Sequence, residues 1–295
     1  MFVKAIEQAS KYTRPIHTIS RMVNNKDVVR GAATLFFINE EGYALTCKHV
    51  IHLLAESDKV NKKFNLFKKE IQELPKNGEY PSKVEALKKS YELNEGSLLQ
   101  MKNRFIDCVD TLTGFTWHLH AEHDLAILKF NGFNRLMCNE FATFKKDESE
   151  IKQGKFLCRL GYPFPEFNNY IYRPEIDDID WTRNGNEKSP SFPIEGMITR
   201  FVGDKSGKIS GIEMSTPGLR GQSGGPLFDQ DGIVYGLQSR TKHLHLGFDL
   251  ENHEIQQGSK KKKINDYSFI HLGECVHVTV IKEFLREHNV KFQEA

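Results

Sequence analysis

The chain has 295 residues, of which 39% are hydrophobic and 27% charged, and its formal net charge at pH 7 is +2. This length and composition are those of a globular protein with a sizeable core, and they exclude a fibrous or disordered chain. Because 41 basic residues nearly balance 39 acidic ones, no overall field attracts nucleic acid or an anionic membrane, and we expect neither as a partner.

Residues 1–21 carry charges every few positions and lack the apolar run of a secretory signal. No stretch of the chain approaches the ~18 apolar residues that a membrane span needs. The cysteines are odd in number, widely spaced and without a CxxC pair, namely Cys47, Cys108, Cys138, Cys158 and Cys275. We therefore expect reduced thiols and a cytoplasmic location.

The first predicted element is a β-hairpin over residues 31–51, where two apolar runs flank a polar turn. Residues 56–106 are rich in Lys, Glu and Leu, and Phe64, Phe67 and Ile71 recur there at helical spacing. We predict that this segment forms an arm of amphipathic helices inserted into a β framework. Its Glu content nearly cancels its Lys content, which disfavours nucleic acid. Contact with a regulatory protein and simple decoration of the fold are the two alternatives.

Strand-like segments follow the arm, with Gly, Pro and Asp turns between them, which indicates an all-β protein with closed or sandwiched sheets. They are residues 115–130, 154–162, 195–203, 207–215 and 232–239. Residues 278–290 have one apolar face and predict a terminal helix. Two charged runs, 175–180 and 259–263, are predicted to be solvated loops, with binding of a charged partner as the alternative.

Residues 218–229, "GLRGQSGGPLFD", set Ser223 between glycines, which suits either a tight turn or the seat of a nucleophile. A serine hydroxyl is a weak nucleophile near neutral pH, so it needs an imidazole to accept its proton and a third group to orient that imidazole. The candidates are His49, at the end of the predicted hairpin, and Asp124, at the start of an apolar strand. The chain order His, Asp, Ser is that of chymotrypsin-like enzymes.

The segments "ALTCKHV", "HDLAILKF" and "GQSGGPLFDQDGIVYGL" resemble the three signature segments of trypsin-like serine proteases, especially the bacterial high-temperature-requirement branch. "LCRLGYPF" and "GECVHVTVIKEFL" are similar to second-barrel segments and the C-terminal helix of that branch. The resemblance implies an all-β fold of two six-stranded β-barrels in the chymotrypsin arrangement. Residues 1–150 would form the first barrel with the helical arm, and residues 151–295 the second barrel with the terminal helix.

The resemblance also implies a serine endopeptidase that acts through an acyl-enzyme. In it Ser223 would be the nucleophile, His49 the general base and acid, and Asp124 the orienting carboxylate. The backbone N–H groups of Gly221 and Ser223 would form the oxyanion hole. No cofactor and no metal ion are expected.

The implied substrate is a protein or peptide whose backbone pairs with the edge strand at residues 236–241, and Gly224 and Gly225 would let the chain approach it closely. The substrate-binding residues by resemblance are Pro217, Arg220, Gln238, Ser239 and Arg240. No acidic residue lies near Pro217, which disfavours a preference for Lys or Arg. Arg220 and Arg240 leave an acidic side chain as an alternative to arginines that simply point to water.

The sequence departs from its relatives in two ways. Gln222 stands where zymogen-type relatives carry an acidic residue, and without an "IVGG"-like start we expect no activation by N-terminal cleavage. No room for a PDZ module follows the terminal helix, so we expect control by a regulatory protein that binds apolar positions of the arm, such as Phe64, Phe67 and Ile71. The alternative function is a catalytically silent, protease-like module that binds peptides or proteins, although a complete triad argues against it.

Histidines at alternate positions could ligate zinc, namely His118 and His120 with His123 nearby, and His243 with His245. They lack a carboxylate or thiol at a matching spacing, so we expect ordinary strand histidines. Cys47 lies two residues before His49 and is predicted to be a small core residue.

Overall fold

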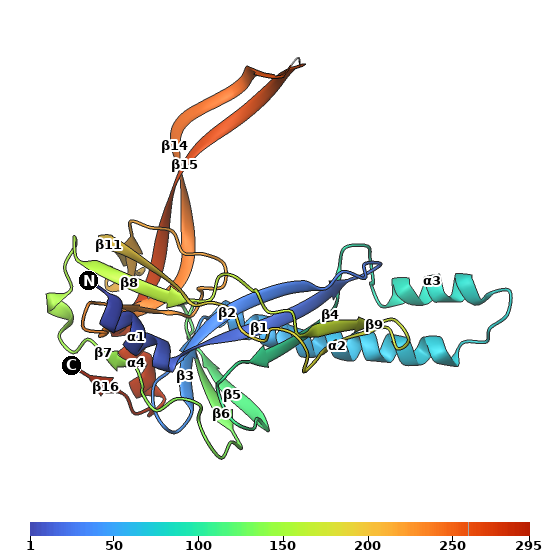
Figure 1. Ribbon diagram of the computed structural model, residues 1–295, viewed down its shortest axis with the longest axis horizontal. Coiled ribbons are helices and arrows are strands. Elements are labelled where there is room, and N and C mark those ends of the chain that lie inside the picture. The colour runs from blue at the N-terminus through green and yellow to red at the C-terminus, as the bar shows by residue number, and fades with distance from the viewer. Residues whose placement is uncertain (259) are drawn as a thin grey trace.

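The computed structural model describes residues 1–258 and 260–295, in which two β-sheets form the body of the molecule (Figure 1). Neighbouring strands of the N-terminal sheet all pair antiparallel. Their spatial order is β4 (Leu98–Phe105), β1 (Thr13–Met22), β2 (Val29–Phe37), β3 (Tyr43–Thr46), β6 (Ala126–Asn131) and β5 (Gly114–Leu119). The predicted hairpin is confirmed as β2 and β3, and Gly42 takes a φ of 85° in its turn, where other residues are strained.

The C-terminal sheet closes on itself as a barrel. Its six ring strands are β13 (Pro226–Phe228), β8 (Phe156–Gly161), β11 (Phe192–Gly203), β12 (Ile209–Met214), β15 (Lys260–His277) and β14 (Val234–Gln257). β13 pairs with both β8 and β14, which completes the ring. β4 and β5 of the first sheet do not pair in the described residues, so that sheet curls without a hydrogen-bonded closure. The predicted all-β, two-barrel architecture is thus confirmed, with only the second barrel sealed by hydrogen bonds.

Short elements complete the second sheet and join the two halves. β7 (Thr143–Phe144) lies between β14 and β16 (Gln293–Glu294), parallel to both, and a separate hairpin is formed by β9 (Tyr170–Arg173) and β10 (Asp178–Trp181). A 3₁₀ turn, η1, spans Glu148–Glu150. The chain passes from the first sheet to the second between β6 and β7, and the division at residue 150 stays a prediction.

One hydrophobic core joins the two sheets. It includes Leu35 of β2, Leu128 of β6, Leu160 of β8 and Leu237 of β14. Two helices cover it on the side where the chain termini lie (Figure 1): α1 (Val3–Tyr12) and α4 (Val278–Glu287). The apolar face of α4 is buried, as the helical period of its sequence requires, so the predicted terminal helix is confirmed.

The helical arm extends to one side of the body and consists of α2 (Lys48–Glu73) and α3 (Tyr80–Ser90) (Figure 1). It differs from the predicted segment at both ends, because α2 begins directly after β3 and Leu98–Phe105 is strand β4. Phe64 and Phe67 are buried in a small cluster with Val23, Leu93 and Leu99, against which Ile71 packs. The prediction that these positions await a partner is therefore wrong, because they hold the arm against the first sheet.

β14 and β15 continue beyond the barrel as a long two-stranded ribbon that projects from the body (Figure 1). Residues 260–263 of the predicted solvated loop lie in β15, residue 259 lies outside the described residues, and Asp178–Trp181 is strand β10 rather than loop. His243 and His245 are confirmed as strand residues of β14, but the length of the ribbon is not predicted, because a ribbon exposed on both faces need not alternate apolar and polar residues throughout. No helix in the described residues has the length and apolarity to span a bilayer.

Candidate active site

His49 and Asp124 meet at the end of the first sheet. His49 lies in the first turn of α2, immediately after β3, and Asp124 lies in the turn that leads into β6. The His49 ring Nδ1 is 2.8 Å from Asp124 Oδ2, and the His49 backbone N–H donates to Asp124 Oδ1 at 3.0 Å. Two contacts to one carboxylate fix both the backbone and the ring of His49, and they leave Nε2 as the free ring nitrogen.

Asp124 is held as a carboxylate. Burial raises its pKa, but the hydrogen bonds from the His49 ring, the Ser239 hydroxyl and the His49 backbone outweigh burial and hold the pKa well below its usual range. The Ser239 hydroxyl donates to Asp124 Oδ2 at 2.6 Å. An ionised carboxylate in this position favours the His49 tautomer that carries its proton on Nδ1.

The Ser223 loop is fastened across the two sheets. Thr34 of β2 donates its hydroxyl to the Gly221 carbonyl at 2.6 Å and its N–H to the Ser223 carbonyl at 3.0 Å. Gly221 and Gly224 have φ values of 92° and 89°, which disfavour any side chain. A Cβ at Gly224 would lie 3.0 Å from Cα of Thr46.

The glycines after Ser223 have a packing role. Gly224 packs on the backbone of the first sheet, and Gly225 packs on the Leu160 backbone of β8. That these two glycines also let the chain approach a substrate closely stays a prediction. Their absence of side chains lets the Ser223 loop sit at the junction of the two sheets.

Ser223 and His49 line the same groove, which has a volume of about 590 Å³. The Ser223 hydroxyl donates to the Ser239 carbonyl oxygen at 3.3 Å, and in the described residues it forms no hydrogen bond with the His49 ring. Ser239 also contacts Asp124, since its hydroxyl donates to the Asp124 carboxylate while its carbonyl accepts from Ser223. The three predicted residues are thus brought to one place, with the serine hydroxyl turned toward β14.

The proposed oxyanion donors have no partners of their own. The N–H groups of Gly221 and Ser223 donate to no atom of the described residues. Gln222, between them, is buried and ties the loop down: its side chain accepts from the Leu219 N–H and donates to the Phe192 carbonyl, both at 3.0 Å. This loop has two backbone donors available for a ligand oxygen.

All five predicted substrate-binding residues line the groove: Pro217, Arg220, Gln238, Ser239 and Arg240. Gln238 and Ser239 are nearly buried, so they form its wall, whereas Arg220 and Arg240 are exposed at its rim. β13 pairs with β14 only as far as Leu237. The Gln238 backbone still bonds to Gly224 and Gly225 on that side. Beyond it the chain pairs with β15, and its other edge, from Ser239 onward, pairs with no strand of the described residues and is open to an extended peptide.

Sequence analysis missed two functional contacts of the site. Ser239 was assigned to substrate, yet its side chain binds Asp124, because the β14–β15 register shifts between Gln238 and Arg240 and a bulge re-aims side chains. Thr34 anchors the serine loop through its hydroxyl and N–H. Neither contact has a local sequence signal, since each depends on strands that are distant in the chain.

Cys47, His49 and Asp124 bring three potential metal-ligand atoms within 4.8 Å of one another, and the described residues contain no second such set. Burial raises the pKa of the Cys47 thiol well above its usual range, and the Asp124 charge adds to this, so the thiol stays protonated. Its Sγ lies 3.2 Å from the Gln238 carbonyl oxygen. A protonated, buried thiol is a poor metal ligand, and Cys47 belongs to the core.

The other histidines considered as zinc ligands have partners of other kinds. The His118 ring stacks on His288 with centroids 4.0 Å apart. His243 Nδ1 lies 2.6 Å from His271 Nδ1, and His245 Nε2 lies 2.6 Å from Asp249. These pairs do not extend to a third ligand in the part of the chain that the structure describes.

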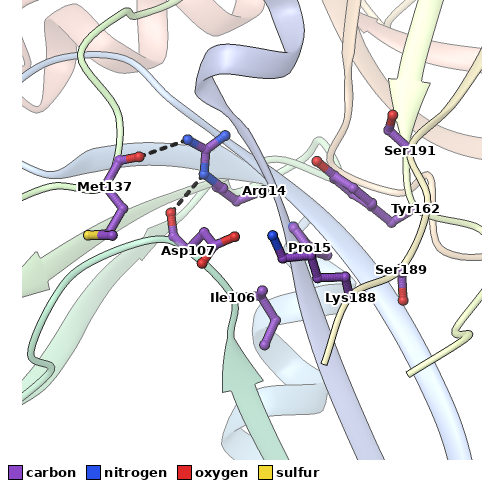
Figure 2. A pocket seen from close by; sticks show the side chains of 9 residues that line it. All are labelled: Arg14, Pro15, Ile106, Asp107, Met137, Tyr162, Lys188, Ser189 and Ser191. Carbon is purple, nitrogen blue, oxygen red and sulfur yellow. Dashed lines mark hydrogen bonds between the residues drawn. The ribbon is translucent and has the colours of Figure 1, made fainter. Parts of the chain in front are cut away.

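A second cavity, of about 540 Å³, has Arg14 and Tyr162 among its lining residues (Figure 2). Arg14 is one of the charged residues that line this cavity. Figure 2 shows the Arg14 guanidinium bonded to the backbone carbonyls of Asp107 and Met137. Further bonds to the carbonyls of Ser10, Lys11 and Thr13 use its remaining donors. Arg14 therefore ties segments together and has no donor left for a ligand.

Comparison with known proteins gives one family and a distant structural likeness. The sequence model of the trypsin-like peptidase domain matches residues 33–237. No curated protein matches the chain in sequence. Among solved structures, the HtrA-type protease AlgW with a tripeptide is 13% identical with a TM-score of 0.46, over 97% of this chain and 63% of that one. The same protease with a decapeptide is 12% identical with a TM-score of 0.45, over 98% and 68%. This chain thus spans less than two thirds of the first of these relatives.

Proposed function

The chain belongs to the trypsin-like peptidase domain family, and from this membership we propose that it is a serine endopeptidase that acts through a Ser-His-Asp triad and an acyl-enzyme. The observation that carries the proposal is the arrangement around one groove. Asp124 orients His49 by two contacts, and Ser223 lines the same groove beside two unpaired backbone N–H groups. These groups are sufficient for acyl transfer without a cofactor.

In the proposed reaction the Ser223 hydroxyl attacks the carbonyl carbon of the scissile peptide bond, and its proton passes to Nε2 of His49. Asp124 keeps the Nδ1 proton in place and stabilises the imidazolium that forms. The N–H groups of Gly221 and Ser223 stabilise the negative oxygen of the tetrahedral intermediate. His49 then gives its proton to the leaving amine, and water, deprotonated by the same imidazole, releases the acyl group from Ser223.

Peptide binding would also prepare the nucleophile. A substrate strand that adds to the open edge of β14 places its backbone N–H against the Ser239 carbonyl oxygen. That oxygen now accepts the Ser223 hydroxyl at 3.3 Å, which is a long hydrogen bond. A substrate N–H that takes over this acceptor releases the hydroxyl to turn toward His49.

A fluorophosphonate probe tests the proposal, because it labels an activated serine whatever the substrate is. We expect labelling of the folded wild-type protein at Ser223, and none of Ser223→Ala or of the denatured wild type. His49→Ala should lose most of the labelling while it keeps the fold. Failure of the folded wild-type protein to react, with and without added peptides, would contradict the proposal.

The second candidate function is a catalytically silent module that holds peptides in the same groove. It is favoured by one observation, the engagement of the Ser223 hydroxyl with Ser239 rather than His49. A silent module would bind extended peptides with equal affinity in the wild type and in Ser223→Ala, and no peptide would induce labelling. Peptide-stimulated labelling separates the endopeptidase from this alternative.

Control by a protein partner is part of the proposal. α2 carries His49 in its first turn and reaches through the whole arm, so a partner that shifts the arm could shift His49. Because Phe64 and Phe67 are buried, the contact would use the outer face of the arm, where Leu66 is 57% exposed. We also propose a cytoplasmic location, which is supported by five free, buried cysteines.

A further inference from the structure

Arg159 lies beneath the groove and is fully buried, with 0% of its surface exposed. It belongs to β8, and the other residues of that strand are uncharged and mostly apolar. Its Nη1 donates to Gln238 Oε1 at 2.8 Å, and its Nη2 donates to the carbonyl and hydroxyl oxygens of Thr216 at 2.9 and 2.5 Å. The guanidinium thus lies between the two chain segments that wall the groove.

In the part of the chain that the structure describes, this buried cation has no counter-ion: no carboxylate forms an ion pair with Arg159. Burial lowers the pKa of its guanidinium. Its Nε–H is buried without a hydrogen-bond partner. Burying a charge without an opposite charge is costly, and an aliphatic side chain on β8 would avoid that cost. Arginine remains charged even when burial lowers its pKa, so the free protein carries an uncompensated charge here.

The position of the charge is one layer behind the groove. Gln238, which accepts from Arg159, itself lines the groove next to Ser223, as does Pro217, the residue after Thr216. On the far side, Gly273 gives the guanidinium its space, because a Cβ there would lie 2.7 Å from the Thr216 carbonyl oxygen and would collide with Nη1. The charge therefore faces the part of the groove beside the nucleophile, across the Gln238 amide.

The rim of the groove has the same sign. Arg220 and Arg240 line it, and Lys242 lies just beyond. Two carboxylates lie near this wall, and both are already engaged: Asp124 by Ser239 and His49, and Glu274 by Arg240 at 2.6 Å and Lys242 at 2.5 Å. A cationic rim above a buried cation attracts anionic groups and repels lysine and arginine side chains.

Resting on the proposed function, we infer that the pocket beside Ser223 takes an acidic side chain, Asp or Glu, on the residue that donates the scissile carbonyl. Arg159 is the specificity-determining residue: its charge, which lies behind the groove wall formed by Gln238, supplies the opposite charge for that carboxylate. The substrate supplies the counter-ion that the fold omits. An uncharged or basic side chain in the same pocket would leave the charge of Arg159 uncompensated. The site would therefore disfavour such substrates as well as favour acidic ones.

Hydrolysis of matched peptides tests the inference in the wild-type protein. The peptides are identical except for Glu, Gln, Asp, Asn, Lys or Phe at the residue before the scissile bond. We expect kcat/KM for Glu to exceed that for Gln by about 10²-fold, the effect of two charges several ångströms apart in a medium of intermediate dielectric. Equal cleavage of the Glu and Gln peptides, or a preference for Lys or Phe, would overturn it.

Two variants identify Arg159 as the source of the preference. Arg159→Met should reduce the Glu-to-Gln ratio to within about threefold, whereas Arg159→Lys, which keeps the charge, should retain at least about tenfold. The matched control is Arg21→Met, which removes another buried arginine, far from the groove and paired with Asp177. It should leave the ratio unchanged. A wild-type ratio that survives in folded Arg159→Met would overturn the assignment. If Arg159→Met does not fold, Arg159→Gln, which also removes the charge but keeps a hydrogen-bonding side chain, is judged by the same criterion.

Binding separates this inference from the proposed reaction. Ser223→Ala is titrated with two peptides that end at the recognised residue, one in Glu and one in Gln. Tighter binding of the Glu peptide by about tenfold or more, in a protein that hydrolyses nothing, would support the acidic pocket while the proposed function fails. Equal affinity for the two peptides, or no binding of either, would overturn the inference whatever the hydrolytic activity.

Discussion

Ser239 donates its hydroxyl to Oδ2 of Asp124 at 2.6 Å, on the same carboxylate oxygen that contacts the His49 ring. One oxygen thus links β14 of the second sheet to the imidazole at the edge of the first. Burial raises the pKa of Asp124, but the hydrogen bond from His49 and then this one from Ser239 help to hold that pKa well below its usual range. Ser239 acts on the chemistry through Asp124 and is a positioning residue.

Ser239→Ala should therefore lower kcat by about 10- to 10²-fold, the worth of one hydrogen bond to a charged group. KM should change little, because the Ser239 backbone that meets the substrate is intact. Ser239→Thr keeps the hydroxyl and should recover most of the rate. Steady-state kinetics of the three proteins check this. An unchanged kcat in Ser239→Ala would show that the hydrogen bond from Ser239 to Asp124 does not contribute to catalysis.

Removal of the nucleophile and removal of the base should reduce peptide hydrolysis to a similar extent. Ser223→Ala is expected to leave the fold intact and to reduce peptide hydrolysis by roughly 10⁴-fold or more, with His49→Ala costing a similar amount. The double variant should be no slower than either single one, because the two residues act as a unit. Hydrolysis rates and a thermal melt of each variant measure this. A Ser223→Ala protein that cleaves peptides as fast as its parent would refute the triad assignment.

The sequence predicts the parts of this molecule in which one short segment carries its own signal. The hairpin of β2 and β3 and the terminal helix follow from apolar periodicity, and Ser223 is marked by its glycines. The sequence predicts His49 and Asp124 from their positions at strand ends, with chain order and family resemblance in support, and their 2.8 Å contact depends on the pairing of β3 with β6.

Other features depend on contacts that no local pattern contains. In the sequence, Arg159 has the pattern of an ordinary strand arginine. Its burial depends on contacts with Thr216 and Gln238, which are distant in the chain. The predicted end of the arm at residue 106 is wrong because Leu98–Phe105 is an edge strand that follows helical segments of similar composition. The β14–β15 ribbon buries neither face, so period-two alternation was never required of its residues.

Stability should fall in mild acid because of His17. This side chain is buried, stacked on Phe167 and bonded to the Ser189 hydroxyl at 2.9 Å, and its Nδ1 has no partner. Burial, aided by the Arg104 charge, lowers its pKa from 6.5 to about 4. As pH falls, the unfolded chain therefore takes up the proton first. The stability that neutral His17 contributes is fully present above about pH 6.5 and decreases as pH falls, and the loss levels off below about pH 4.

For His17 alone the loss is about 2 kcal/mol at pH 5. His277 is also buried with a pKa of about 4, so it adds a loss in the same direction. Urea unfolding at pH 7 and pH 5 measures the total, and His17→Gln should make the pH dependence shallower. Identical slopes in the wild type and His17→Gln would show that His17 does not contribute.

The thiol prediction concerns the compartment. All five cysteines are free and buried, so thiol counting on the denatured protein, purified without reductant, should find five reactive groups. The native protein should react slowly, because burial raises the pKa of each thiol, to about 12 at Cys158 and Cys275. A reproducible intramolecular disulfide would contradict the proposed cytoplasmic location.

The last prediction concerns the arm. The base of α2 is fixed in the main core through Val50, Ile51 and Leu54, and its outer half is held by the cluster around Phe64. Phe64 is 2% exposed, so Phe64→Ala should cost about 3–5 kcal/mol of the local stability of that cluster. The outer half of α2 then becomes free to pivot, and because His49 belongs to the same helix, kcat/KM should fall about tenfold, somewhat less than a 1 Å displacement costs.

Leu66→Ser is the matched control, since Leu66 lies on the same helix but is 57% exposed. It should leave both stability and hydrolysis by the isolated protein unchanged. Amide exchange reports whether Phe64→Ala has loosened residues 60–73 while the segment anchored by Val50, Ile51 and Leu54 stays protected. If the arm is loosened and hydrolysis is as fast as in the wild type, the arm does not communicate with His49, and control through it is ruled out.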